Sequence, residues 1–259
     1  TKARENEAML ALYPRVVREL DGHVDAREAL LLAIEGVFAG NIFDLGAGAT
    51  SRLFAKESPD FFKVRGEVGG KRPWLVDNFE ALAADLLGAA GATRRPPGQA
   101  LFFCDNAGSD FVLGVLPFCR FLAMRGTRVL IAANRLPALN DMTIAEARAL
   151  LPRVGAMDPV LRRLLAEDRI RAIDSGGAAP LIDLREISEE VNAAANGTDL
   201  VILEGMGRAC ETNYEARFTV PALKLAMIKE EIVARRHGGK LFDTLCRYDA
   251  ATKLVTGGG

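Results

Sequence analysis

The chain has 259 residues, of which 49% are hydrophobic, so it is long enough for one large domain or two unequal ones. Its 33 Lys and Arg residues nearly balance its 34 Asp and Glu residues, and the formal net charge is -1. This balance excludes a global basic field that would attract nucleic acid or an anionic membrane, so an anionic ligand has to be recognised locally.

The first part of the chain is predicted to be helical. Apolar residues at helix-like spacing predict helices over 2–20, 26–38 and 77–91. The stretch TRRPPGQ (93–99) contains two prolines and two arginines, which indicates a boundary. We therefore expect a helical part over 1–96, followed by a second part over 97–259.

Short apolar runs alternate with helical stretches in the second part. Runs rich in β-forming residues predict strands over 100–104, 127–133, 169–174 and 199–204. Helices are predicted over 110–125, about 143–151, 158–167 and 186–196, and a longer helix over 221–239 precedes a final strand over 240–248. Pro117 should kink the first of these helices or mark a break in it. This alternation is typical of an α/β fold with a mostly parallel, Rossmann-like sheet and helices on both faces.

Polar residues gather directly after the predicted strands. Open parallel sheets bind ligands at the carboxyl ends of their strands, so these positions are candidates for a site. In strand order they are Asp105, Asn106, Gly108 and Asp110; Asn134, Asn140 and Asp141; Ser175, Gly176 and Gly177; and EGMGR (204–208).

The stretch LFFCDNAGSD (101–110) ends an apolar run on a carboxylate and an amide. With Asp141, Asp105 and Asn106 offer hard oxygen ligands that suit Mg²⁺ or Mn²⁺. Alternatively, Asp105 caps the following helix and Asn106 forms a turn, and the pattern alone leaves both interpretations open. Asp110 directly precedes the helix and is assigned to its cap, whereas Cys104 is predicted to be a buried core thiol.

The segment EGMGR follows the fourth predicted strand. Gly205 and Gly207 let the backbone approach a ligand closely. Arg208 can bind a phosphate through two N–H groups, and Glu204 can hold a water molecule. The alternative is a glycine turn with a surface ion pair.

Two lysines, Lys224 and Lys229, fall in the long helix predicted over 221–239. Both are solvated helix lysines by default. Lys224 is the more interesting of the two, because it lies near the helix start inside the apolar stretch PALKLAMI.

The cysteines and histidines exclude several kinds of site. Four cysteines stand far apart without a CxxC spacing, which argues against a zinc ribbon or a disulfide framework and fits the reducing cytoplasm. His23 and His237 lie beside glycines and charged residues, which argues against Ser–His catalysis and histidine metal centres. No apolar run approaches the ~20 residues of a membrane span. The chain begins at Thr1 rather than Met, which indicates a trimmed chain or a fragment.

The stretch IFDLGAGA (42–49) supports a competing interpretation. It is similar to the glycine-rich first motif of S-adenosylmethionine-dependent methyltransferases. Its context differs from theirs, because a predicted helix precedes it and it lies outside the alternating region. Alternatively, Asn41 and Asp44 are polar groups that the helical part presents to the pocket.

Taken together, these segments resemble the damage-control phosphatase family, a metal-dependent group. The resemblance is carried by AGNIFDLGA, RPWLVDN, FFCDNAGSDFVLGVLPF, RGTRVLIAANRLPALNDMT, LVILEGMGR, LKLAMIK and GGKLFD. EGMGR is typical of the subfamily found as stand-alone plant proteins and in the C-terminal half of vertebrate pantothenate kinase-like proteins.

The resemblance implies a cytoplasmic enzyme that hydrolyses small phosphorylated metabolites. The implied substrates are 4'-phosphopantetheine and its oxidised or damaged derivatives, and the implied cofactor is a divalent cation such as Mn²⁺, Ni²⁺, Co²⁺ or Mg²⁺. Carried over by motif, the metal ligands are Asp105, Asn106 and Asp141, and the essential motif covers Glu204 to Arg208. Neither nucleic acid nor a membrane is an expected partner.

We expect three groups of residues to act on the phosphate ester. Arg208 and Lys224 would neutralise the phosphate charge, and Glu204 would orient or deprotonate the attacking water. The substrate-binding residues are expected to be Asn41, Asp44, Gly108, Gly205, Gly207, Arg208 and Lys224. A non-catalytic module that keeps the metal site for structure is the remaining alternative.

Overall fold

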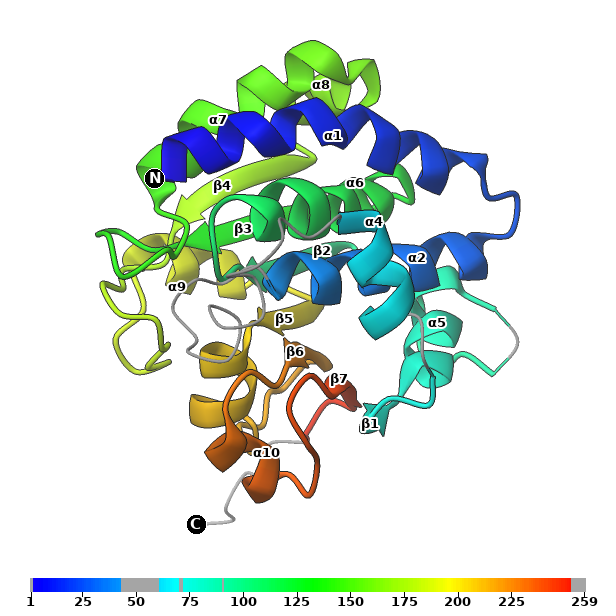
Figure 1. The fold of residues 1–259 in the computed structure, drawn as a ribbon, viewed down its shortest axis with the longest axis vertical. Coiled ribbons are helices and arrows are strands. Elements are labelled where there is room, and N and C mark those ends of the chain that lie inside the picture. Colours follow the sequence, from blue (N-terminus) through cyan, green and yellow to red (C-terminus); the bar gives the residue numbers. More distant parts are fainter. Residues whose placement is uncertain (1, 43–60, 70–71, 90, 253–259) are drawn as a thin grey trace.

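A computed structural model describes residues 2–42, 61–69, 72–89 and 91–252. Within these residues one seven-stranded sheet has the order β1-β7-β6-β5-β2-β3-β4 (Figure 1). Its strands are β1 (Val76–Asp77), β2 (Gln99–Phe103), β3 (Arg128–Ala133), β4 (Ile170–Asp174), β5 (Leu200–Glu204), β6 (Ala222–Met227) and β7 (Thr244–Asp249). Strands β6, β5, β2, β3 and β4 are parallel, whereas β7 pairs antiparallel with β6 and parallel with β1. The predicted mostly parallel α/β sheet is confirmed.

Helices cover both faces of the sheet. One face carries α1 (Lys2–Gly22), α2 (Ala26–Asn41), α4 (Phe61–Val64), α5 (Phe79–Leu87), α6 (Leu116–Met124), α7 (Ile144–Met157) and α8 (Pro159–Ala166). The other face carries α9 (Glu189–Ala195), the π-helix η3 (Met206–Thr212) and α10 (Glu231–Arg236). A second π-helix, η1 (Arg65–Gly69), directly follows α4.

Burial on both faces explains why the central strands read as continuous apolar runs. In β2, Ala100 and Phe102 belong to the apolar cluster of the first face, whereas Leu101 and Phe103 belong to that of the second. A strand with both faces buried needs apolar residues at successive positions rather than at alternate ones. Full burial of each large side chain contributes about 1.5–3 kcal/mol.

The segment between residues 221 and 239 differs from the prediction. The long helix expected there is wrong: residues 222–227 form β6 in the middle of the sheet, and only residues 231–236 form a helix. Ala, Leu, Lys and Met are good helix formers, which misled the interpretation. All six residues of β6 are buried between the two helical layers, and this tertiary packing outweighs local propensity.

The helix predicted over 110–125 is also divided. A π-helix, η2 (Asp110–Val115), passes into α6 at Leu116. Pro117 is therefore the second residue of α6, where its missing N–H group is tolerated. It marks the change from π to α geometry, and π-helical turns occur frequently at functional sites.

Residues on both sides of the predicted boundary near residue 96 contribute to the same core. Phe38 and Trp74 belong to the same apolar cluster as Phe102 and Phe118. The helical part thus lies directly on the sheet and brings α2 against η2. The division into 1–96 and 97–259 stays a prediction.

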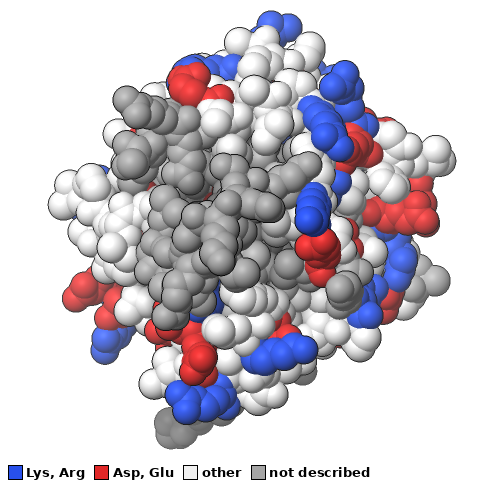
Figure 2. All heavy atoms as spheres, viewed as in Figure 1, with Lys and Arg blue, Asp and Glu red and all other residues white. Residues whose placement is uncertain are grey.

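The surface carries charges of both signs. On the face in Figure 2, Lys and Arg side chains are interspersed with Asp and Glu among the described residues. None of the helices in the described ranges is both long enough and apolar enough to span a bilayer.

Candidate functional site

The strand order creates a crevice between β2 and β5. From β2 the chain continues to β3 and β4 on one side, and then returns to β5 and β6 on the other. Ligands of open α/β sheets bind at such a reversal, outside the carboxyl ends of the strands. Asp105 follows the end of β2 and Glu204 is the last residue of β5, so both lie at this point.

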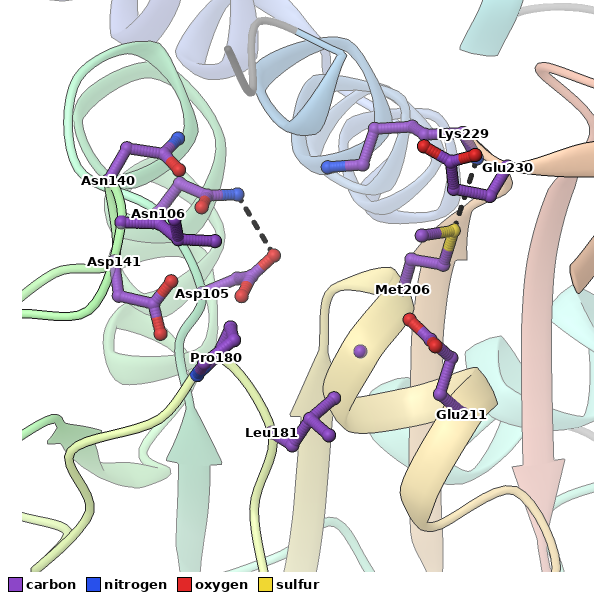
Figure 3. A pocket seen from close by; sticks show the side chains of 12 residues that line it. Asp105, Asn106, Asn140, Asp141, Pro180, Leu181, Met206, Glu211, Lys229 and Glu230 are labelled. Carbon is purple, nitrogen blue, oxygen red and sulfur yellow. Dashed lines mark hydrogen bonds between the residues drawn. The ribbon is translucent and has the colours of Figure 1, made fainter. Parts of the chain in front are cut away.

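A cavity of about 190 Å³ opens at this edge of the sheet. Asp105, Asn106 and Asp141 line one side, whereas Met206 and Lys229 lie across from them (Figure 3). The three residues predicted to bind a metal are therefore brought together. Further lining residues include Leu139, Leu181, Glu211 and Glu230.

Backbone pairing positions the two loops that carry these ligands. Asn106 and Asp141 form an isolated antiparallel bridge, and the Met142 N–H donates to the Asp105 carbonyl at 2.8 Å. The Asn106 amide donates to Asp105 Oδ2 at 2.9 Å. The loops after β2 and β3 thus form one rigid unit at the cavity.

Arg208 joins the two acidic side chains of this side. One terminal nitrogen of Arg208 donates to Asp105 Oδ1, and the other donates to Asp141 Oδ2 at 2.7 Å. The guanidinium is fully buried. Burial opposes its charge, but the carboxylates of Asp105 and Asp141 outweigh this effect and raise the pKa of Arg208. A cationic group between these carboxylates shows that the position attracts positive charge.

The donor set fits a divalent cation. Asp105, Asn106 and Asp141 all line the cavity and offer carboxylate and amide oxygens, with no thiolate or imidazole among the lining residues described. Such oxygen ligands suit Mg²⁺ or Mn²⁺. Asn134, a strand-end candidate that was not among the predicted ligands, donates through its amide to Asp141 Oδ2 at 2.8 Å, and its Oδ1 accepts from Arg208 at 3.3 Å. Its place directly after β3 was the available signal.

Asp110 does not cap the helix, which corrects its assignment, but contacts Asn106 instead. Ser109 occupies the N-cap position, and Asp110 Oδ2 accepts from the backbone and side-chain nitrogens of Asn106, both at 3.1 Å. Burial, followed by the negative charge of Asp105, raises the pKa of Asp110 to about 7. The residue thus contacts the predicted metal ligand Asn106 directly.

Asn41 lies behind Asp105 and does not line the cavity. Its Nδ2 donates to Asp105 Oδ2 at 3.2 Å, to Asp110 Oδ2 at 2.8 Å and to Glu204 Oε1 at 2.8 Å. The side chain at the end of α2 thus contacts three carboxylates. Asp44, the other residue predicted from this stretch, lies outside the described residues, as does all of IFDLGAGA except Ile42.

Glu204 is fully buried and holds Asp105 from the neighbouring strand. Its Oε2 accepts from the Asp105 backbone N–H at 2.7 Å. Burial, followed by the charges of Asp110 and Asp105, raises the pKa of Glu204 well above its usual value. The carboxylate is absent from the described cavity lining, so its predicted contact with a water in the cavity has no geometric support.

The predicted glycines have different roles. Gly205 has φ +99°, and a Cβ there would overlap the carboxyl group of Asp105. Gly207 lines the cavity. Gly108 has φ +71°, and its N–H donates to Asn6 Oδ1 of α1 at 2.8 Å, which links it to the helical part.

Lys229, rather than the predicted Lys224, lines the cavity. Lys224 lies in the middle of β6, and its ammonium donates to Asp249 at 2.9 Å and to the carbonyls of Tyr214 and Ala216. It is not among the described residues of the cavity. Lys229, just past the end of β6, lines the cavity, and its ammonium donates to the Asn41 carbonyl at 3.0 Å. Figure 3 shows its side chain extending toward the wall that carries Asn106 and Asp105.

Residues 1–245 match the family model of the damage-control phosphatase ARMT1-like domain. The chain is 39% identical to pantothenate kinase 2 of Arabidopsis thaliana, over 96% of this chain and 30% of that protein. It is 36% identical to a damage-control phosphatase of Arabidopsis thaliana, over 96% of this chain and 65% of that protein. It is 33% identical to the 4'-phosphopantetheine phosphatase of Mus musculus, over 97% of this chain and 36% of that protein.

The chain thus spans about a third of the pantothenate kinase and 4'-phosphopantetheine phosphatase sequences that it matches. Among solved structures, a DUF89 family protein from Pyrococcus horikoshii superposes with a TM-score of 0.66 at 20% identity. That match covers 97% of this chain and 74% of the other, which shows that the two share a fold.

Proposed function

The chain belongs to the damage-control phosphatase ARMT1-like domain family, and from this premise we propose that it hydrolyses phosphomonoesters of small metabolites at the cavity between β2 and β5. The observation that carries the proposal is the meeting of Asp105, Asn106 and Asp141 with Arg208 and Lys229 at one strand edge. Oxygen ligands for a cation and two cationic side chains are the components that phosphoryl transfer requires. We place the enzyme in the cytoplasm.

In this proposal Asp105, Asn106 and Asp141 hold a divalent cation, with Mn²⁺, Ni²⁺, Co²⁺ and Mg²⁺ as candidates. A cation there supplies a Lewis acid that polarises a phosphoryl oxygen. Asn134 keeps the Asp141 carboxylate in place through its amide N–H. Glu204 fixes the backbone of Asp105 and acts as a positioning residue.

Two cationic groups balance the charge of the phosphate. Lys229 offers a buried ammonium on the wall across from Asp105, and it takes the role that the sequence interpretation gave to Lys224. Arg208 supplies a guanidinium that is already held in place by Asp105 and Asp141. Fixed cations of this kind stabilise the negative charge that develops on the transferred phosphoryl group.

The cavity lining supports a phosphate attached to a slender organic chain. Leu139, Leu181 and Met206 contribute apolar side chains to the lining, and those of Leu139 and Leu181 are exposed. Apolar side chains beside charged ones suit 4'-phosphopantetheine, which the name of the mouse relative indicates, and we extend the proposal to its oxidised or damaged derivatives.

The test is phosphate release by the purified chain. We expect release from 4'-phosphopantetheine in the presence of Mn²⁺, loss of release in excess chelator, and recovery when Mn²⁺ is restored. Asp141→Asn should abolish release, whereas the control Glu189→Gln, at an exposed position on α9, should not change it. Absence of release from this compound and from a panel of sugar phosphates, with each of the four metals, would contradict the proposal.

A further inference from the structure

Behind the predicted metal ligands lies a second cluster of oxygen atoms. Asp105, Asp110 and Glu204 each offer one carboxylate oxygen, and these three atoms lie within 4.8 Å of one another. Asp105 belongs both to this cluster and to the cavity lining. Asp110 and Glu204 are buried and are absent from the described lining. Divalent cations bind oxygen at about 2.0–2.6 Å, so ligands on opposite sides of one ion are about 4–5 Å apart.

Two polar atoms of this cluster have no partner. Among the described residues, Asp110 Oδ1 and Asn41 Oδ1 are buried without a hydrogen bond, and both side chains are at least 98% buried. An unpaired buried carboxylate oxygen costs free energy unless a cation or a proton satisfies it. The other polar atom of each side chain, Asn41 Nδ2 and Asp110 Oδ2, forms hydrogen bonds within the cluster.

The amide of Asn41 occupies the centre of the cluster. Its single Nδ2 donates to all three carboxylates, although an amide nitrogen carries only two hydrogens. Rotation of the amide by half a turn would exchange Oδ1 and Nδ2. In that orientation Oδ1 becomes a fourth oxygen ligand, and a cation takes the place of the two N–H groups.

The charge balance favours a second cation as well. Metal ligands bind as ionised carboxylates, and in that form the four buried carboxyl groups described here, those of Asp105, Asp110, Asp141 and Glu204, exceed the two cationic side chains Arg208 and Lys229 by two charges. One divalent cation would neutralise this excess of two negative charges. A bound phosphate dianion then restores the excess, and a second divalent cation cancels it.

We infer that Asp105, Asp110, Glu204 and Asn41 form a second divalent-cation site, which shares the Asp105 carboxylate with the cation held by Asn106 and Asp141. The inference rests on the proposed function, since it places the second ion next to the first. A carboxylate that bridges two cations holds them about 3.5–4 Å apart, the spacing of two-metal hydrolytic centres. Mg²⁺ and Mn²⁺ are the ions that this all-oxygen set suits.

Mn²⁺ binding to the metal-depleted chain tests the inference. We expect two Mn²⁺ per wild-type chain by elemental analysis after gel filtration, with an exchange-coupled electron paramagnetic resonance spectrum at low temperature. Asp110→Asn should bind one Mn²⁺ with an uncoupled spectrum, as should Asn41→Leu, which removes the amide. The control Glu189→Gln changes an exposed carboxylate on α9, away from both the cluster and the cavity, and should keep two coupled ions.

One uncoupled Mn²⁺ in the wild type would overturn the second site, and so would two ions that persist in Asp110→Asn. The first result needs no variant, so the wild-type count is decisive even if a variant fails to fold. Phosphate release measured on the same samples separates the two claims. One ion with normal phosphate release leaves the proposed function standing, whereas no bound ion and no release removes both.

Discussion

The carboxylate of Glu204 accepts a 2.7 Å hydrogen bond from the backbone N–H of Asp105, and this bond joins the ends of the neighbouring strands β5 and β2. The two residues are 99 positions apart in the chain. The bond fixes where Asp105 leaves the sheet, and therefore where its carboxylate meets the cavity. Glu204 therefore positions Asp105 from the neighbouring strand, although it is absent from the described cavity lining.

Replacing Glu204 with Gln should impair the site more than the fold. The Gln amide can keep one oxygen for the Asp105 N–H, but its NH₂ group then faces the Asn41 Nδ2, which now donates to Glu204 at 2.8 Å. Two donors cannot satisfy each other, so one side chain must turn away. We expect kcat/KM for phosphate release to fall by about 10–100-fold. Circular dichroism should show an unchanged fold, and Glu189→Gln provides the control.

A Glu204→Gln enzyme with wild-type kcat/KM would show that the carboxylate is not needed to position Asp105. A collapse of the fold would instead assign Glu204 to stability. Glu204→Asp separates these outcomes, because it keeps the charge but shortens the reach.

The sequence predicted the position of this site better than its internal contacts. Parallel strands bring their carboxyl ends to one edge, so Asp105, Asn106 and Asp141 were expected to meet without any knowledge of their contacts. No local pattern indicates that Asn41 reaches Glu204, 163 residues away, or that Asp110 turns back to Asn106. Such contacts arise only when α2 packs on η2.

The error over β6 had a direct consequence for the site. A helix over 221–239 favours Lys224, near its start, whereas a strand that ends at Met227 brings Lys229 to the cavity. The sequence could not distinguish the strand from a helix here, because β6 is composed of good helix formers. Burial on both faces also removes the alternation of apolar and polar residues that identifies a strand.

The two lysines should respond differently to the same substitution. Lys229→Met removes a buried ammonium from the cavity, so we expect kcat/KM for phosphate release to fall by about 100-fold or more. Lys224→Met breaks a buried pair with Asp249, so we expect the free energy of unfolding to fall by about 2–4 kcal/mol. Turnover per folded Lys224→Met molecule should stay within about threefold of wild type.

Urea denaturation and initial rates on the same preparations check both lysine variants. Asp249→Ala should reproduce the stability loss of Lys224→Met, and the double variant should lose less than the sum of the two. If Lys224→Met lost as much turnover as Lys229→Met, the original prediction that Lys224 binds the phosphate would be supported.

Gly205→Ala should disable the site through a single methyl group. The residue has φ +99°, a backbone conformation that residues other than glycine rarely adopt, and the added Cβ would overlap the Asp105 carboxyl group. We expect a loss of about 1–3 kcal/mol in the free energy of unfolding and a much larger relative loss of Mn²⁺ affinity. Gly22→Ala is the matched control, because a Cβ at Gly22 would meet no atom within 4 Å. Equal Mn²⁺ affinity in wild type and Gly205→Ala would show that Asp105 can shift without cost.

In excess chelator, the stability of the chain should fall as the pH rises. Burial and the charge of Asp105 raise the pKa of Asp110 from 3.8 to about 7, so the folded state keeps a proton that the unfolded state has already lost. Between about pH 4 and pH 7 the unfolded state therefore binds fewer protons, and the free energy of unfolding decreases through this window and levels off above it. The raised pKa of Glu204 acts in the same direction.

Asp110→Asn isolates the contribution of one carboxyl group to this decrease. Each unit of raised pKa corresponds to about 1.4 kcal/mol. Between pH 5 and pH 8 in chelator, the free energy of unfolding of the variant should therefore rise relative to that of wild type by a few kcal/mol. Saturating Mn²⁺ should remove most of the wild-type decrease, because a cation stabilises the ionised carboxylates in place of protons. Guanidinium denaturation at both pH values, with and without Mn²⁺, measures these differences. Parallel pH profiles for wild type and Asp110→Asn would show that the Asp110 proton is equally bound in both states.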